Sequence, residues 1–557
     1  MKSRIRNMTR CGFAAAALAA LTACGGGDSG PPPPATYTVG GTVTQLFGSG
    51  LVLGLVLQNG GGADLPISAS GTFTFGTRVV SGTPYSVSVA AQPSTPAQDC
   101  SVANASGTVA AADVTNVNVF CLGHTVGGTV SGLVGSGLEI QMSKPSHGQL
   151  IVIGNPLQIN SNGAFTFDPA YNLSVATEVD ITQQPASPTQ LCVIHNTGIA
   201  GIVAQGANVT DVEVVCSRFS YVANAGDNTV SAYTVDATSG ALAAVGTSVG
   251  TGTSPHAIVG TQDKKYVFVA NESSNNISAF AVNSASGALT AVPGSPLARR
   301  LAHPKALALL GTPLGAYPVG TYLYVANAGS DTVAAFAVDT SNGSLTPLSP
   351  ATFATGKGPS SIAVDPTGRF IYVANNGGSN DVSAFSVDTA TGLLTPLVGS
   401  PFPAGANPLS LALGATGKFL YTANPDATNS SISGFSVDLG SGVLTPLSGS
   451  PFPLAVSHYM ATDRTGAYLY VTAGSGVVGY GIDGTTGMLT ALPGFPVVTG
   501  TDAHSVTLDP TNQFLYVAND SSADVSGFRF DASTGGLTPI TGSPFPAGNL
   551  PDFVTVF

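Results

Sequence analysis

The sequence has no tryptophan and little charge: of 557 residues, 17 are Lys or Arg and 29 are Asp or Glu, which gives a net charge of −12. Because this charge is spread thinly and forms no basic stripe, we expect no nucleic-acid partner. The histidines and six cysteines do not cluster at ligand spacing, so we expect no metal, and no motif points to a cofactor. After the first 25 residues, no apolar run is long enough to span a bilayer.

The chain begins with an export signal. Basic residues precede an apolar stretch, residues 12–21, that is too short to be a membrane anchor. The stretch ends in Leu21-Thr22-Ala23-Cys24, which resembles a bacterial lipobox; the alternative is an ordinary cleaved signal with a chance cysteine. We therefore predict a lipoprotein signal peptide over residues 1–24, with lipid on Cys24 that holds the protein to a membrane surface.

The residues after Cys24 bear on location. Gly25 stands where lipoprotein families retained in the inner membrane carry aspartate, so the resemblance favours the outer membrane of a bacterial cell envelope. Residues 25–36 include Pro31–Pro34 and predict a semi-stiff tether. Whether the protein faces the periplasm or the exterior stays open.

The two halves of residues 37–216 repeat one another. Short strands at a spacing of roughly ten residues predict two small immunoglobulin-like β-sandwich modules, residues 37–121 and 122–216. The repeated segments are Thr38–Val43 with Thr125–Val130, and Gly71–Phe75 with Gly163–Phe167.

Each module ends in an alternating strand that closes on a cysteine. With the two N-terminal cysteines assigned to signal and lipid, one pair remains in each module, and an exported chain favours oxidation. We predict the disulfides Cys100–Cys121 and Cys192–Cys216. Each closes a loop of about twenty residues, worth roughly 3 kcal/mol in the chain-entropy model.

Residues 217–557 carry the tetrapeptide Tyr-Val-Ala-Asn, intact or altered, seven times. Successive gaps are 47, 56, 48, 49, 49 and 46 residues, a period typical of propeller blades. Each unit adds a turn that has Asp or Asn, and then Gly four residues later. The sequence thus predicts an all-β chain, two sandwich modules followed by a seven-bladed β-propeller. The copies begin at Tyr221, Phe268, Tyr324, Tyr372, Tyr421, Tyr470 and Tyr516.

The two ends of the repeat are complementary. The propeller begins at Phe219 on a second strand, and residues 551–557 form a first strand with nothing after it. We predict that this C-terminal strand completes the first blade, because closure removes both open sheet edges.

Residues 219–557 resemble the lactonase-type seven-bladed propellers, a group that includes 6-phosphogluconolactonases and the YVTN repeat proteins of bacterial and archaeal surfaces. The shared patterns are Tyr-Val-Ala-Asn, then Asn-Thr-Val-Ser-Ala-Tyr (Asn228–Tyr233), then Thr-Gly-x-Leu-Thr-Pro (Thr391–Pro396). WD40 propellers are disfavoured because the chain lacks tryptophan. The resemblance is specific for the fold and does not by itself carry a function.

Titratable residues recur just before the first strands, which line the channel of a propeller. Together with His303 and Asp502, this register predicts a ligand-binding site at the channel mouth. Arg299 and Arg300 lie in the same segment as His303 and suggest a cationic sector for a carboxylate or phosphate. The alternatives are a hydrated polar rim and a solvated loop. The register contains His256, Lys305, Ser360, Leu409, His458, His504 and Asp552.

The family comparison adds catalytic candidates. Lactonase relatives carry Pro-Arg-His before a blade with Asn-Glu-Leu, and elsewhere Pro-His-Ala-His-Ser-Val. Here His256 follows proline without the arginine, Glu272 keeps the Asn-Glu pair, and His504 keeps Ala-His-Ser-Val with Asp502 in place of the first histidine. The resemblance implies His256, Glu272 and His504 as acid/base catalytic residues.

Two hypotheses follow from different classes. In the first, the chain is a cell-envelope lipoprotein whose propeller binds a small molecule, carbohydrate or protein at its channel mouth and top-face loops. In the second, it is a lactone hydrolase resembling 6-phosphogluconolactonase. The missing arginine and the export signal favour the first, because phosphogluconolactone is a cytoplasmic metabolite.

Overall fold

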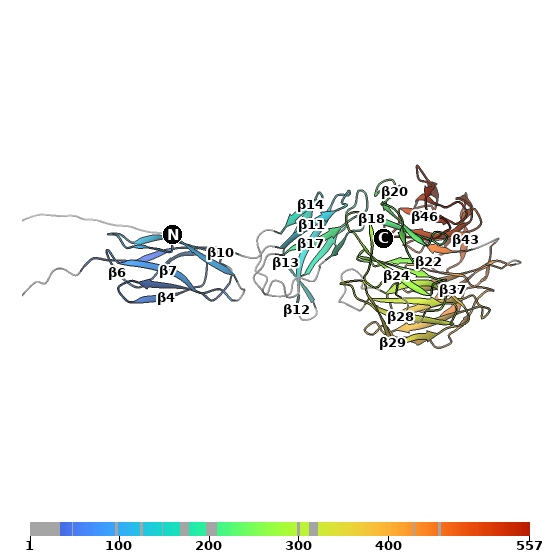
Figure 1. The fold of residues 1–557 in the computed structure, drawn as a ribbon, viewed down its shortest axis with the longest axis horizontal. Helices are drawn as coiled ribbons and strands as arrows, with labels where there is room; N and C mark the ends of the chain where they lie inside the picture. The colour runs from blue at the N-terminus through green and yellow to red at the C-terminus, as the bar shows by residue number, and fades with distance from the viewer. Residues whose placement is uncertain are drawn as a thin grey trace, which may run out of the picture. The chain divides into compact units, whose positions relative to one another are not determined.

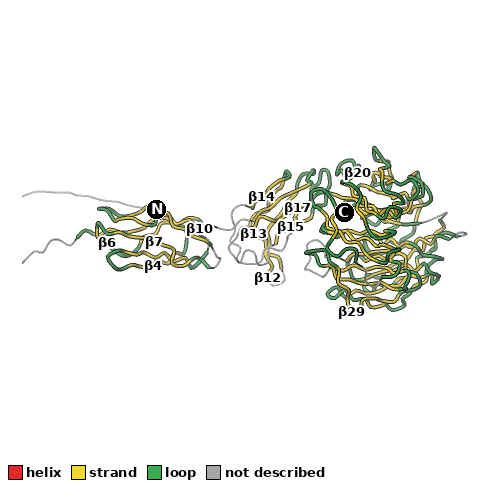
Figure 2. Tube along the Cα trace, viewed as in Figure 1, coloured by secondary structure: helices red, strands yellow, loops and turns green. Residues whose placement is uncertain are grey.

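The computed structural model of this protein describes most of the chain. The predicted signal peptide with Cys24, most of the tether, and Arg299 and Arg300 lie outside the described residues. Within them all regular structure is strand (Figure 2), which confirms the all-β fold class, and no helix there has the length and hydropathy to cross a bilayer. Described are 34–46, 48–94, 98–122, 126–146, 149–167, 178–195, 209–297, 301–310, 321–426, 429–454 and 458–557.

The chain separates into two compact units, Met1–Leu122 and Gly123–Phe557. The first unit is a sandwich of two four-stranded sheets, in the orders β5-β2-β10-β8 and β4-β3-β7-β9, with β1 paired to β6. Val39 and Val117 from one sheet pack with Leu53 and Val87 from the other in a shared core. Its strands are β1 (Thr36–Tyr37), β2 (Val39–Thr44), β3 (Leu51–Leu57), β4 (Gly62–Ile67), β5 (Gly71–Thr74), β6 (Val79–Val80), β7 (Pro84–Ala91), β8 (Asp99–Ala103), β9 (Ser106–Thr108) and β10 (Val114–Leu122).

The second unit starts with another sandwich of the same plan (Figure 1). Its sheets have the orders β14-β11-β17-β16 and β13-β12-β15, and one core joins Val130 and Val212 to Ile140 and Val179. The immunoglobulin-like character of both modules stays a prediction. The strands are β11 (Val126–Ser131), β12 (Leu138–Ser146), β13 (Gln149–Ile159), β14 (Gly163–Thr166), β15 (Glu178–Gln183), β16 (Val193–His195) and β17 (Val209–Val215).

The repeated Gly-Gly pair allows two backbones to approach closely in each sandwich. Strand β2 pairs in parallel with β10, and β11 with β17, each with a register irregularity at this point. A Cβ added to Gly41 would lie 1.6 Å from the carbonyl oxygen of Val117, and one on Gly128 would lie 1.6 Å from that of Val212. Only glycine fits at these two positions.

Both predicted disulfides are confirmed. Cys100 and Cys121 face each other on the neighbouring strands β8 and β10. Cys192 and Cys216 join the chain just before β16 to the chain just after β17, which pair with each other. Each bond therefore fastens the last strand of a module to its neighbour.

The remaining strands form seven sheets, and each runs from a first strand at the channel to a fourth at the rim, which confirms the predicted propeller. First strands are β50 (Pro551–Val556), β22 (Pro255–Gly260), β26 (Pro304–Leu310), β30 (Pro359–Val364), β35 (Ser410–Leu413), β40 (Met460–Thr462) and β45 (Ala503–Leu508). Second strands are β18 (Arg218–Asn224), β23 (Tyr266–Asn271), β27 (Tyr322–Asn327), β31 (Phe370–Asn375), β36 (Phe419–Asn424), β41 (Tyr468–Thr472) and β46 (Phe514–Asn519).

The outer half of each blade follows the same order, and short strands in five blades add a second pairing to the third strand. Third strands are β19 (Thr229–Val235), β24 (Asn276–Val282), β28 (Thr332–Val338), β32 (Asp381–Val387), β37 (Ser431–Val437), β42 (Gly476–Ile482) and β47 (Asp524–Phe530). Fourth strands are β20 (Leu242–Ala244), β25 (Leu289–Ala291), β29 (Leu345–Ala354), β33 (Leu394–Pro396), β38 (Leu444–Pro446), β43 (Leu489–Ala491) and β48 (Leu537–Pro539). The short strands are β21 (Val249–Gly250), β34 (Phe402–Pro403), β39 (Phe452–Pro453), β44 (Val497–Val498) and β49 (Phe545–Pro546).

The ring closes as the sequence predicts. Strand β50 pairs antiparallel with β18, so the C-terminus lies beside the first propeller strand (Figure 1). The backbones of Phe219 and Phe557 exchange two hydrogen bonds of 3.1 Å. Next to this seam, the buried Arg218 contacts Asp509 of the last blade at 2.6 Å, which joins first and last blades by a charge pair as well. We number the blades from this closing blade, so that β50 and β18 belong to blade 1.

Six of the seven blades are clamped to the next by the tyrosine of the repeated motif; blade 2 has Phe268 at this position. The buried tyrosine hydroxyl donates to the carbonyl of the turn glycine that follows the third strand of the next blade. That glycine has a φ between 71° and 77° in all blades, and a Cβ on it would meet an aromatic ring of the preceding blade. The Tyr and Asp/Asn-x-x-x-Gly signals in the sequence are thus two halves of one contact. The pairs are Tyr221–Gly287 (2.8 Å), Tyr324–Gly392 (2.9 Å), Tyr372–Gly442 (2.9 Å), Tyr421–Gly487 (2.7 Å), Tyr470–Gly535 (2.6 Å) and Tyr516–Gly240 (2.6 Å).

We expect Tyr372→Phe to lower the free energy of unfolding by about 1–3 kcal/mol, because the buried carbonyl of Gly442 loses its donor while the ring still fills its space. Urea unfolding measures this loss, with Tyr37→Phe in the first unit as the same substitution outside the propeller. An unchanged midpoint for Tyr372→Phe shows that the clamp does not stabilise the ring.

Candidate functional site

The predicted register before the first strands is a set of β-bulges. In blades 1, 2, 3, 4 and 7 the first strand skips one residue against the second strand near its start. A bulge leaves the extra residue outside the ladder and re-aims its side chain. The skipped positions hold Asp552, His256, Lys305, Ser360 and His504, so the sequence register and the backbone geometry agree.

A tight backbone turn precedes these bulges. The residue before the strand has a positive φ of 53° at Ser254, 48° at His303, 62° at Asp502 and 51° at Leu550. Two predicted ligand-binding residues, His303 and Asp502, are therefore turn residues, one step before the strand itself. This explains why His303 does not share the register of the other histidines.

Asp552 is the centre of the site because it contacts two histidines. Its carboxylate lies 2.6 Å from Nδ1 of His504 and 3.6 Å from Nδ1 of His256. Nδ1 of His504 is also 2.9 Å from the backbone carbonyl of Asp552. Because a carbonyl oxygen only accepts, Nδ1 of His504 carries the proton, which leaves Nε2 as its basic nitrogen.

The charges of this group shift its pKa values. Burial alone lowers the pKa of His504, but the hydrogen bond and charge of Asp552 outweigh burial and raise that pKa above its usual value. Burial raises the pKa of Asp552, yet the charge of His256 and the bond from His504 hold it below its usual value. The two shifts therefore favour a carboxylate on Asp552 beside an imidazolium on His504.

Aromatic and imidazole rings complete the cluster. The centroid of the Tyr459 ring is 4.7 Å from that of the His504 ring. The ring centroids of His256 and His458 are 6.2 and 6.1 Å from the same His504 centroid. Burial, with the charges of Asp552 and Glu272, raises the pKa of Tyr459, so its hydroxyl stays protonated. Among the described residues, Nδ1 of His256 and Nδ1 of His458 are buried without a hydrogen-bond partner, and that of His256 faces the carboxylate of Asp552 at 3.6 Å.

The predicted catalytic set divides into two groups. Glu272 contacts Lys305 at 3.3 Å and His303 at 4.0 Å, whereas His256 and His504 meet on Asp552. The Glu272 group is more exposed, with 59% of the His303 side chain accessible. Asp552, which the sequence predicts as a ligand-binding residue, is thus the carboxylate that contacts both His256 and His504.

Two residues of the site, Tyr459 and Asp520, were not predicted from the sequence. Tyr459 follows His458 directly, and it is buried between blades where only the fold brings it to His504. Asp520 follows the last motif asparagine, and burial with the charge of Asp552 raises its pKa although His504 opposes the shift. Asp520 could have been predicted from its position directly after the motif asparagine, because Glu272 occupies the same position in blade 2.

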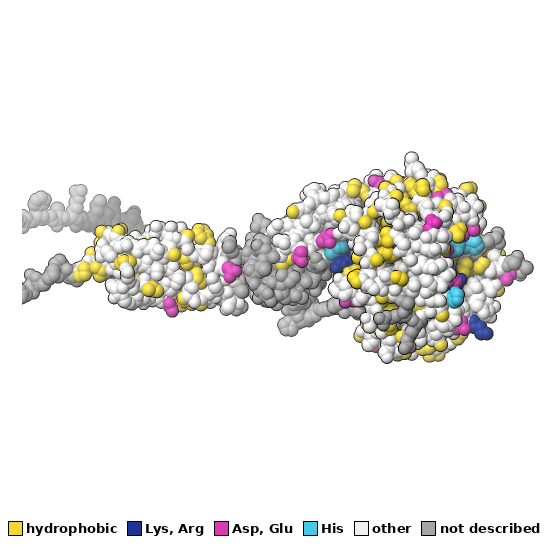
Figure 3. Space-filling model, in the orientation of Figure 1, with side chains coloured by type: hydrophobic (Ala, Val, Ile, Leu, Met, Phe, Trp, Pro, Cys, Tyr) yellow, Lys and Arg dark blue, Asp and Glu magenta, His cyan; other side chains and the backbone are white. Residues whose placement is uncertain are grey.

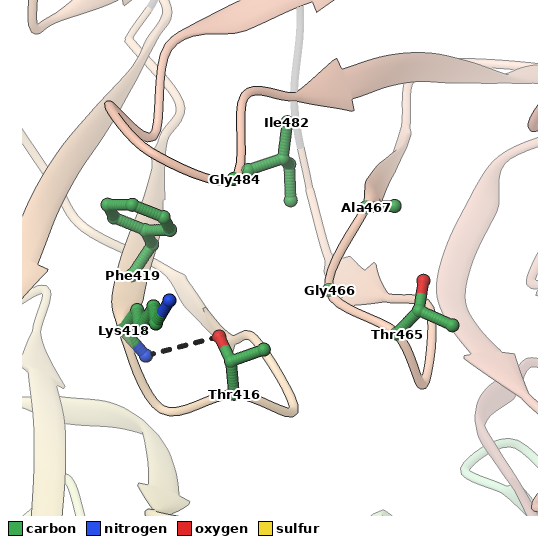
Figure 4. A pocket seen from close by; sticks show the side chains of 8 residues that line it. All are labelled: Thr416, Lys418, Phe419, Thr465, Gly466, Ala467, Ile482 and Gly484. Atoms are coloured by element: carbon green, nitrogen blue, oxygen red, sulfur yellow. Dashed lines mark hydrogen bonds between the residues drawn. The ribbon is translucent and has the colours of Figure 1, made fainter.

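The histidines lie on one end of the channel, and Figure 3 shows histidine and acidic side chains close together at one side of the propeller. A different cavity, of about 220 Å³, opens at the other end of the first strands (Figure 4). It is lined by the β35–β36 turn with Thr416 and Lys418, by Phe419, and by Thr465 and Ile482 of blade 6. It lacks titratable groups other than Lys418, so we place the candidate site at the histidine end.

The comparisons with known proteins agree with the fold. The family model described as "Lactonase, 7-bladed beta-propeller" matches residues 177–299 and 316–406. A Bacteroides uniformis protein described as a 6-phosphogluconolactonase is 17% identical, with a TM-score of 0.53, over 61% of this chain and 99% of its own.

Two further solved structures show the same fold at similar identity. A Bacteroides fragilis protein with the same description is 19% identical (TM-score 0.51), and the periplasmic gluconolactonase of Pseudomonas aeruginosa is 19% identical (TM-score 0.50). Both cover 61% of this chain, with 98% of the Bacteroides fragilis chain and 99% of the Pseudomonas aeruginosa chain included. No curated protein matches the chain in sequence.

We expect Asp552→Asn to lower the pKa of His504, which NMR titration of the imidazole signals measures. Because the folded protein raises this pKa, the stabilisation is complete below the ordinary value near 6.5 and is lost as the pH rises through the raised value. The melting temperatures of wild type and Asp552→Asn therefore differ more at pH 6 than at pH 9. His303→Gln, at the exposed residue, is the control, and an equal difference at both pH values argues against the pairing.

Proposed function

Because residues 219–557 form a lactonase-type seven-bladed propeller, we propose that this chain is an exported lipoprotein that binds a ligand through the channel mouth of that propeller. The observation that carries the proposal is the Asp552–His504–His256 group, which joins three blades at one point. Convergent polar groups with shifted pKa values mark binding sites more often than plain surface.

The chemistry of the site favours a small, oxygen-rich ligand such as a carbohydrate, a hydroxy acid or a lactone. Imidazole nitrogens of His256 and His458 and the hydroxyl of Tyr459 donate or accept single hydrogen bonds. The carboxylate of Asp552 offsets their positive charge, so a strongly anionic ligand gains little at this point. The alternative ligand is a protein that binds the top-face loops of the propeller.

The location follows from the N-terminal sequence. Lipid at Cys24 anchors the chain to a membrane, the outer membrane being favoured by Gly25, and residues 25–36 serve as a tether. The disulfides in both sandwich modules fit an oxidising compartment outside the cytoplasm.

Lactone hydrolysis is the second candidate, and the His504–Asp552 pair favours it. Nε2 of His504 takes a proton from water, the resulting oxygen nucleophile adds to the lactone carbonyl, and the ring oxygen leaves with that proton as a hydroxyl group. Asp552 orients the imidazole and stabilises its charged form. The description of the Pseudomonas aeruginosa neighbour makes gluconolactone the first compound to test.

Cys24→Ser tests the anchor. We expect wild type to sediment with membranes and to incorporate radiolabelled palmitate, and the variant to do neither, because the thioether carrying the lipid cannot form. Cys11→Ser is the matched control, since the predicted cleavage removes that residue. Membrane association that survives Cys24→Ser contradicts the lipobox assignment.

A lactone panel tests the site. Calorimetry and proton release with glucono-δ-lactone are compared for wild type, His256→Ala and His504→Ala, with Lys418→Ala at the far end of the channel as control. We expect both histidine variants to bind at least tenfold more weakly, and any turnover to fall about 10²- to 10⁴-fold in His504→Ala. Binding without turnover supports the binding module, whereas neither binding nor turnover by wild type removes lactones from the candidate ligands.

A further inference from the structure

Blade 6 differs from its neighbours near the channel mouth. In five blades the motif asparagine donates to a serine two residues into the third strand, as Asn375 does to Ser383 (2.9 Å) and Asn519 to Ser526 (2.9 Å). In blade 6 these two positions hold Ala473 and Val478. An apolar pair thus replaces a buried amide–hydroxyl pair at one place in the ring.

A cavity of about 470 Å³ lies at this place, between blades 5 and 6. Its lining is almost entirely apolar and includes Leu454, Ala473, Val478, Tyr480 and Pro496. Leu454 and Tyr480 are only partly buried, and they pack against the core that blades 5 and 6 share. The volume falls within the range of about 300–1,000 Å³ typical of small-molecule sites.

The wall of the cavity is also the wall of the histidine cluster. Gly474, which lines the cavity, accepts a hydrogen bond of 2.6 Å from the backbone of Ala503, the neighbour of His504. Thr472 donates to the carbonyl of His504 at 2.8 Å and accepts one from the backbone of His458 at 3.0 Å. One short segment, residues 472–474, therefore lines the apolar cavity and also bonds the backbone of His458 and His504, so the two places are neighbours.

We propose that this cavity holds the alkyl part of an amphipathic ligand whose oxygen-bearing head, a lactone ring or its hydroxy acid, meets the histidine cluster. The inference rests on the proposed function of the channel mouth and adds the ligand class. The polar cluster forms hydrogen bonds with the head, and burial of the tail against the apolar lining of blade 6 stabilises the complex. The Ala473–Val478 pair makes this sector of the ring selective for such a tail.

The double substitution Ala473→Asn with Val478→Ser tests the cavity, because it restores the Asn–Ser pair that five of the other blades contain. The full chain is titrated with the uncharged fluorophore N-phenyl-1-naphthylamine. We expect wild type to bind it and the double variant to bind at least tenfold more weakly. Val398→Ser, the same change at an exposed residue of blade 4, leaves binding unchanged. Equal affinity in wild type and a folded double variant overturns the proposal.

A lactone series tests the link to the histidines. γ-Butyrolactone, γ-octalactone and γ-decalactone share one head, and we expect wild-type affinity to rise about threefold for each buried methylene. The double variant loses this dependence and keeps its affinity for γ-butyrolactone. His504→Ala weakens all three compounds by a similar factor, because it removes a contact to the head.

The outcomes separate the two proposals. Binding of all three lactones with equal affinity overturns the apolar cavity as a subsite and leaves the channel-mouth site standing. Fluorophore binding that depends on Ala473 and Val478, without binding of any lactone, overturns the amphipathic lactone as the ligand and removes lactones from the candidate ligands of the channel mouth. Where the double variant fails to fold, as circular dichroism shows, Val478→Ser alone replaces it, with at least a threefold loss expected.

Discussion

The ring depends on the hydroxyl that each motif tyrosine donates to a glycine carbonyl of the next blade. A propeller blade touches only its two neighbours, so the angle between blades is set locally and repeated around the circle. A buried hydroxyl without a partner is costly, and a glycine at positive φ presses directly on an aromatic ring, so neither half of the contact tolerates change. Phe268 in blade 2 is the exception, because it has no hydroxyl to donate to the next blade.

This fixed geometry makes the bulges useful. The first strand has the same place in every blade, and in five blades a bulge near its start turns a side chain out of the ladder at the same register. Asp552, His256 and His504 come from three blades and still meet within hydrogen-bonding or ion-pair distance. The repeated residues determine the fold of each blade, and the residues that differ at the bulge position near the start of the first strand form the candidate site. Blade 6 also departs from the repeat at another pair of positions, where Ala473 and Val478 replace an asparagine and a serine.

The sequence predicted the fold well because the period, the disulfide pairs and the strand left over at the C-terminus are each visible as a pattern. The register of the site was predictable for the same reason, since Asp552 and His504 occupy corresponding positions in their units. Which of these residues contact one another was not predictable from the sequence. The family resemblance suggested Glu272 together with His256 and His504, whereas its contacts are with Lys305 and His303. No pattern in the sequence predicted Tyr459 beside His504. Which blades adjoin follows from the ring, but side-chain reach across a channel depends on bulges and turns that a single sequence does not display.

Asp552 lies on β50, the strand that closes the circle. The strand that completes the ring is thus also the one that supplies the carboxylate between His256 and His504. A propeller in which β50 is not paired with β18 keeps both histidines but lacks the group that brings them together. Assembly of the site is in this sense coupled to folding, because the cluster forms only once the first and last propeller strands have paired.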